Sequence, residues 1–169
     1  MQVDTDANTG PIALRLQLEA VPFIAIANGT HKYVHIELRL ATSGSSGIGV
    51  VTKRIVRSYR GLKSHAENYR VAMQRTLATL AGMVTATQEG DCGSTVGTCN
   101  GGSESHGAGV RLSARVIGGG RITCDHERRT ASVFGYSRTF GRVEGCNKRT
   151  AGLISTHLQY TVSWTDGGY

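Results

Sequence analysis

The strongest constraint on the fold is a strict alternation of apolar and polar residues between positions 34 and 40. One side of an extended chain would carry Val34, Ile36, Leu38 and Leu40, and the other side would carry His35, Glu37 and Arg39. Because successive side chains of a strand point to opposite faces, this period of two predicts a strand with one buried face. Asn28-Gly29 precedes the strand and favours a tight turn, so we expect a β-hairpin over residues 23–40.

Other segments extend this β-rich pattern. Alternation recurs at 11–20, 110–117 and 158–164, and residues 48–56 are rich in β-branched side chains. We expect Gly118–Gly120 to end the strand before them. Residues 64–84 carry a helical apolar stripe, and Ser64 with Glu67 has the spacing of a capping box; a short alternation near Tyr69 leaves a strand open as the alternative. Asp125 is a candidate start for a second helix.

These elements predict one domain spanning residues 1–169. Its expected fold class is α+β, mainly an antiparallel β-sheet with one or two helices. A length of 169 residues is typical of a single domain. No apolar run is long enough to cross a membrane, and no signal peptide is visible, so we expect a protein made inside a cell with no membrane partner.

The charge of the chain favours a polyanionic partner. The formal net charge is +7, with 15 Arg and 4 Lys, and a guanidinium presents a planar donor fork that matches phosphate oxygens. We predict an RNA-contacting sheet surface formed by Arg39, Lys53, Arg54, Arg111 and Arg115. The alternative is that these cations pair with Glu37 or other carboxylates and only solvate the surface.

Two cysteines flank a loop rich in Gly, Ser and Thr. Cys92 and Cys99 are too far apart for the usual zinc knuckle, even with Cys124 and His126 as further candidate ligands. We therefore predict that Cys92 and Cys99 form a disulfide, which either closes the loop or links subunits. Free thiols are the alternative, and the sequence leaves open whether Cys124 and Cys146 pair.

Catalytic patterns are weak throughout the chain. His35 and Glu37 would share a strand face, but an exposed polar face explains them better than an acid–base pair. The group Asp125, His126 and Glu127 is best explained as a solvated loop. There is no P-loop and no nucleophile elbow. We expect no catalytic residues, no metal and no cofactor, which favours a protein that is not an enzyme.

Residues 41–80 resemble the opening of the ribonuclease H family. "ATSGSSGIGVV" and "SHAENYRVAMQRTLATL" have the order of its first strands and first helix. Glu67 matches the family's helix glutamate, but Ser43 stands where the family has a metal-binding aspartate. The resemblance implies a ribonuclease H-like nuclease, and the missing aspartate argues that it is degenerate, because two-metal chemistry needs clustered carboxylates.

A second segment resembles the coat proteins of single-stranded RNA phages. The order of "NYRV" (68–71), the loop with Cys92 and Cys99, "VRLSARV" and "TCDHER" (123–128) is similar to theirs. The resemblance implies self-assembly into a homo-oligomer, subunit-linking cysteines and RNA binding. We therefore expect a viral coat protein, assembled in the host cytoplasm and located in the virion. The alternatives are a ribonuclease H-like enzyme and a small basic nucleic-acid-binding domain.

Overall fold

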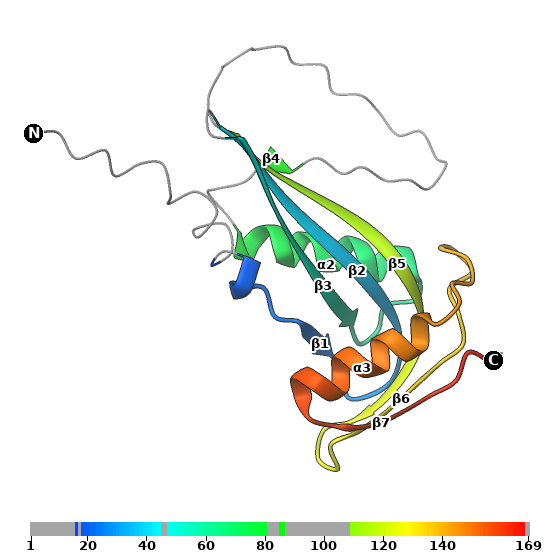
Figure 1. Ribbon diagram of the computed structural model, residues 1–169. Helices are drawn as coiled ribbons and strands as arrows, with labels where there is room; N and C mark the ends of the chain where they lie inside the picture. The colour runs from blue at the N-terminus through cyan, green and yellow to red at the C-terminus, as the bar shows by residue number, and fades with distance from the viewer. Residues whose placement is uncertain (1–15, 17, 45–46, 81–84, 87–108, 168–169) are drawn as a thin grey trace, which may run out of the picture.

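The computed structural model describes residues 16, 18–44, 47–80, 85–86 and 109–167. Among these residues the strands form one seven-stranded sheet in the order β1-β3-β2-β5-β6-β7, with β4 also pairing with β5. The sheet and the helices on it confirm the predicted α+β class (Figure 1). That the whole of 1–169 is a single domain stays a prediction. No described helix is long and apolar enough to cross a membrane.

Three long strands form the centre of the sheet: β2 (Gly29–Gly44), β3 (Gly47–Ser58) and β5 (Gly109–Asp125). β2 runs antiparallel to both neighbours. The short strands are β1 (Ile24–Ile26), β4 (Thr85–Ala86), β6 (Thr130–Phe134) and β7 (Thr161–Trp164). β1, β4 and β7 each pair in parallel, and β6 pairs antiparallel to β5.

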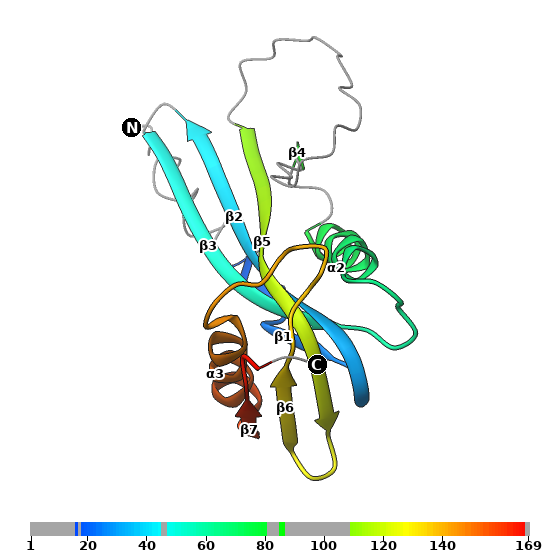
Figure 2. The same cartoon turned by 90° about the vertical axis from the view of Figure 1, so that its right-hand side faces the viewer.

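Two helices cover opposite faces of the central strands. α2 (His65–Thr79) lies on one face and α3 (Cys146–Leu158) on the other, as the two views in Figures 1 and 2 show. The alternation in β2 decides which residues meet which helix. Its even-numbered apolar residues lie in a cluster with Ala72 and Met73 of α2, and Tyr33 lies in a second cluster with Ala151 and Ile154 of α3. The predicted buried face of residues 34–40 is therefore confirmed.

Several local predictions need correction. β1 pairs with β3 in parallel, so residues 23–40 do not form the hairpin that Asn28-Gly29 suggested. Residues 16 and 18–20 are helical, where the alternation at 11–20 predicted a strand. Residues 126–129 form a turn in which Asp125 Oδ1 accepts from Arg128 N at 3.0 Å, so Asp125 does not start a helix.

The predicted helix is confirmed over His65–Thr79, and residues 81–84 of the segment lie outside the described residues. Ser64 is the N-cap, and its side chain accepts a hydrogen bond from Glu67 N at 3.0 Å. Glu67 Oε2 in turn accepts from Lys63 N at 3.0 Å. These two bonds satisfy backbone donors that a helix start otherwise leaves unpaired, which fixes where α2 begins.

Candidate functional site

The helix cap places one histidine at a fixed point of the fold. His65 is the first residue of α2, and its side chain is buried. Its Nε2 lies 2.9 Å from the carbonyl oxygen of Gly120 on β5. Because a carbonyl can only accept, Nε2 must carry the proton, and in the neutral ring this leaves a lone pair on Nδ1.

The glycines at 118–120 allow the His65 ring to lie this close to the backbone of β5. A Cβ on Gly119 would lie 2.7 Å from Tyr33 O and 3.2 Å from His65 Cδ2. A Cβ on Gly120 would lie 2.6 Å from Phe134 O. The prediction that Gly118–Gly120 end the strand is therefore wrong: β5 continues to Asp125, and the glycines let neighbouring strands and the imidazole come close to its backbone.

The surroundings of His65 keep its imidazole neutral. Burial is the largest cause that lowers the pKa of His65 below its usual 6.5, and the positive charges of Lys32 and Arg121 lower it further. The hydrogen bond to Gly120 acts in the opposite direction. The net effect is an imidazole that is unprotonated at neutral pH and has a basic Nδ1.

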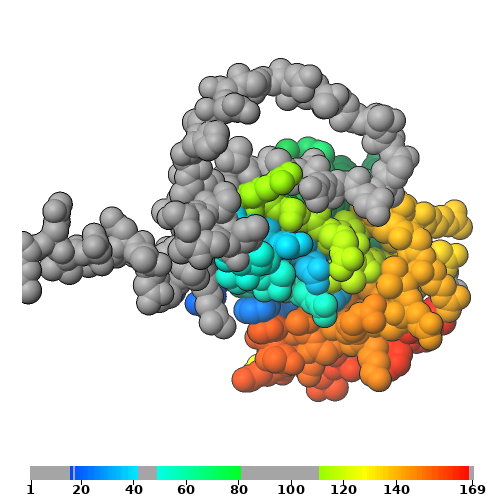
Figure 3. All heavy atoms as spheres, turned by 45° about the horizontal axis from the view of Figure 1, so that its top comes forward, coloured from blue at the N-terminus to red at the C-terminus, as the bar shows by residue number. Residues whose placement is uncertain are grey.

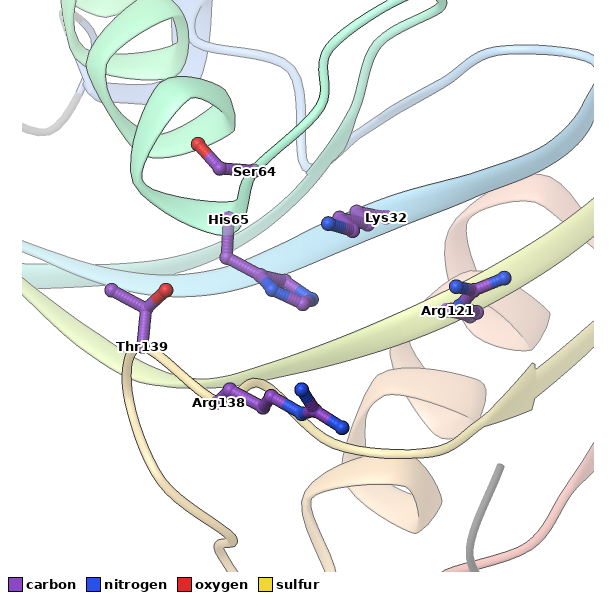
Figure 4. A pocket seen from close by; sticks show the side chains of 6 residues that line it. All are labelled: Lys32, Ser64, His65, Arg121, Arg138 and Thr139. Carbon is purple, nitrogen blue, oxygen red and sulfur yellow. The ribbon is translucent and has the colours of Figure 1, made fainter.

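A strongly cationic pocket of about 330 Å³ surrounds this ring, which we call the α2 pocket. It is lined by Lys32, Ser64, His65, Arg121, Arg138 and Thr139 (Figure 4). These residues come from β2, the start of α2, β5 and the segment after β6, and Lys32 donates to the carbonyl of Lys63. None of the lining residues is acidic. Three cations, two hydroxyls and a helix N-terminus together suit a phosphate group.

The pocket opens beside a second hollow of about 380 Å³. Both are lined by Lys32 and Arg121, and the second adds further residues of β2, among them His31, and residues 61–63 before α2. A phosphate group in the α2 pocket would therefore have room beside it for the molecule that carries it.

The five predicted RNA-contacting residues do not share one face. Arg39, Arg54, Arg111 and Arg115 fall on the α3 side of the sheet by register, whereas Lys53 falls on the α2 side. Side chains of β2, β3 and β5 stay uncovered beyond α3 on that face (Figure 3). Lys53 is buried, and its Nζ donates to Leu18 O at 2.9 Å.

Glu37 binds two of these arginines. Its carboxylate lies 3.1 Å from Arg54 Nε and 3.1 Å from Arg115 Nη2. This is the pairing that the sequence offered as the alternative to RNA contact. None of the five residues lines the α2 pocket, and their binding of RNA stays a prediction, as does self-assembly.

Among the remaining residues that the sequence singled out, His35, Glu37 and the described cysteines do not line the α2 pocket. His35 Nδ1 lies 3.0 Å from Thr150 Oγ1, so His35 meets α3, whereas Glu37 binds Arg54 and Arg115. Cys124 and Cys146 are buried free thiols, and Cys92 and Cys99 lie outside the described residues. Within the described part of the chain, no three His, Cys, Asp or Glu side chains gather to hold a metal.

The ribonuclease H pattern does not assemble in space. Ser43 lies near one end of β2, and the α2 N-terminus that carries Glu67 lies beside Lys32 near the other end. Ser43 is eleven residues after Lys32 along β2, which corresponds to about 35 Å. The two positions therefore cannot share a metal pair.

Sequence reasoning missed Lys32, His65, Arg121 and Arg138. The signals that could have found them were a histidine directly after a helix N-cap and an arginine directly after three strand glycines. Neither is diagnostic in isolation, because the four residues meet only when β2, α2, β5 and the segment after β6 pack together.

Comparison with known proteins overturns the coat-protein hypothesis. The sequence model of the Janus/Ocnus family (Ocnus) matches residues 18–162. The 14 kDa phosphohistidine phosphatase of Sus scrofa is 24% identical over 159 residues, which is 94% of this chain and 100% of that protein. Both findings point to cellular proteins and neither to a phage coat, so the predicted capsid function and virion localisation are wrong.

The local order of motifs that suggested a coat was a chance likeness. It depended on the loop around Cys92 and Cys99 and on three short segments, of which "NYRV" (68–71) lies in the helix α2. The alternatives of a ribonuclease H-like nuclease and a small nucleic-acid-binding domain find no support either. Since the family match spans most of the residues, the chain belongs to the Janus/Ocnus family.

Proposed function

We propose that this chain is a phosphatase that hydrolyses phosphohistidine in proteins, with His65 as the general base. The observation that carries the proposal is a buried, neutral imidazole that lines a pocket with three cations. The similarity to the phosphohistidine phosphatase of Sus scrofa supports the choice of substrate.

The three cations of the α2 pocket would bind the phosphoryl group. Lys32, Arg121 and Arg138 would hold the phosphoryl oxygens and stabilise the charge that they carry in the transition state. The N-terminus of α2 adds its dipole, since Ser64 and His65 at the start of the helix line the same pocket. The second hollow, which is also lined by Lys32 and Arg121, leaves space for the residues that flank phosphohistidine in a protein.

His65 would activate the attacking water. Its Nδ1 takes a proton from the water as the water oxygen bonds to phosphorus, and the bond between phosphorus and the substrate nitrogen breaks. The proton that His65 accepts then passes through solvent to the leaving imidazole nitrogen, so the products are histidine and inorganic phosphate and His65 is neutral again. The Gly120 carbonyl, 2.9 Å from Nε2, holds the ring in this tautomer and stabilises the imidazolium that forms.

The test is the rate of phosphate release from a phosphohistidine peptide. His65→Asn should lower kcat by about 10²- to 10⁴-fold, the usual contribution of a positioned general base. The matched control is His157→Asn, because His157 is exposed on α3 and does not line the α2 pocket. Equal rates for His65→Asn and the wild type would overturn the proposal, as would an equal loss in both variants.

A further inference from the structure

A further cavity lies on the opposite face of the sheet, between α3 and the strands β2 and β3. This cavity, the α3 pocket, measures about 250 Å³ and is lined by His35, Arg54, Arg149, Gly152, Leu153 and Thr156. It shares no lining residue with the α2 pocket. The phosphatase site proposed above therefore does not use the α3 pocket.

The buried imidazole of His35 lines this pocket. Its Nδ1 lies 3.0 Å from Thr150 Oγ1, but its Nε2 has no hydrogen-bond partner and is shielded from solvent. His35 itself is 0% exposed. A buried polar atom without a partner destabilises a fold, so an unsatisfied imidazole nitrogen at a cavity needs an explanation.

Two arginines give the α3 pocket a positive potential. Arg54 comes from β3 and Arg149 from α3, and no lining residue is acidic. Arg54 contacts Glu37 through Nε, and Arg149 Nη2 donates to Glu144 O at 3.1 Å. A guanidinium has five N–H donors, so both side chains keep donors for a further acceptor. Burial first, and then the charges of Arg54 and Arg149, lower the pKa of His35 to about 4.

Gly152 keeps the α3 pocket open. It lies inside α3, where glycine is a poor helix former. Packing does not require it, because a Cβ built at this position would meet nothing within 4 Å. A side chain here would instead extend from the helix surface that lines the pocket.

We propose that the α3 pocket binds a phosphate group, with Arg54 and Arg149 on its oxygens and His35 Nε2 as a further donor. Thr150 can donate to Nδ1, which places the ring proton on Nε2. An anion also favours the protonated ring, in which both nitrogens donate. The site does not depend on the phosphatase proposal, because it uses a separate cavity and separate residues.

The experiment follows the backbone amide signals of Gly152, Leu153 and Thr156 by NMR during titration with inorganic phosphate at constant ionic strength. We expect saturable shifts at these residues. A parallel titration with O-phosphoserine distinguishes free phosphate from a phosphate ester by which binds more tightly. Acetate should not saturate the site; if it binds as tightly as phosphate, the assignment to phosphate is wrong.

Three variants locate the binding. Arg149→Gln should weaken the affinity at these amides about tenfold or more, since it removes a charged donor. Gly152→Met should abolish the shifts by filling the pocket, and Arg149 is exposed, so its variant remains informative if Gly152→Met does not fold. Arg39→Gln, on the same sheet face but outside the pocket, should leave the affinity unchanged.

The result that would overturn the site is equally specific. If the three amides do not move, or respond in Arg149→Gln and Gly152→Met as in the wild type, the α3 pocket does not bind phosphate. The same spectra report the α2 pocket through the amide of His65. Shifts there without shifts at Gly152 would reject the α3 site while leaving the phosphatase proposal intact.

Discussion

Replacing Gly120 by alanine tests whether the close packing of β5 at its glycines positions His65, the proposed general base. The added Cβ would lie 2.6 Å from Phe134 O and 2.9 Å from Gly135 O. Both are backbone atoms next to β5, so neither can move aside without shifting the strand. Forced overpacking of this kind costs about 1–3 kcal/mol.

The same substitution should also impair catalysis. Gly120 O is the acceptor that fixes the tautomer of His65 at 2.9 Å, and a displaced strand would carry this carbonyl with it. Urea unfolding followed by circular dichroism should show a midpoint lowered by roughly 1 M, given m values of about 1–3 kcal/mol per M. Phosphate release measured under folding conditions should fall as well.

Gly152→Ala is the matched control, because it makes the same chemical change where a Cβ has open space. It lies inside α3, so alanine should stabilise the protein by up to about 1 kcal/mol. If Gly120→Ala is as stable and as active as the wild type, the close approach of β5 to its neighbours does not constrain the site, and the reasoning fails.

Two further predictions concern pH. Because the pKa of His65 is lowered from 6.5, kcat should be constant near neutral pH and decline only as the pH falls through a value below 6.5, which a pH–rate profile checks; an inflection above 7 would contradict it. Burial, with the charges of Arg54 and Arg149, lowers the pKa of His35 to about 4. The unfolded chain therefore binds a proton between pH 6.5 and 4 that the folded chain does not, and the free energy of unfolding should fall by roughly 3 kcal/mol over that range. Urea unfolding across these pH values should show a shallower slope in His35→Leu than in the wild type; identical slopes would contradict the prediction.

The parts of the fold that the sequence predicted are those specified by local chemistry. The alternation around Val34 and Leu38 identified the buried face of β2, because a strand's period is set by the backbone. Ser64 and Glu67 identified the start of α2, because the cap is formed within four residues. Both signals can be evaluated without knowing the rest of the chain.

The parts of the fold that sequence reasoning missed depend on tertiary contacts between residues far apart in the chain. The N-cap of α3 is Gly145, which has a φ of 67° and makes no side-chain cap bond, so no capping signal marks the start of this helix. The glycines at 118–120 suggested a strand end, whereas they are packing positions against Tyr33 and Phe134. Only the tertiary structure shows that distinction.

The candidate site was missed for the same reason. The excess of arginine suggested affinity for phosphate oxygens, which stays a prediction, and the alternating pattern favoured exposed strand positions such as Arg111 rather than Arg121 and Arg138. Lys32 and His65 are far apart in sequence and carry no shared motif. They meet only because α2 starts beside β2 and β5 (Figure 4).

The most direct test of the central claim is the protonation state of His65, measured by long-range ¹H–¹⁵N correlation of its ring during a pH titration. The structure predicts a neutral ring at pH 7 with the proton on Nε2, a lone pair on Nδ1 and a pKa below 6.5. A ring that is protonated at pH 7, or a neutral ring with its proton on Nδ1, would contradict the account, because His65 would then have no basic nitrogen to activate water.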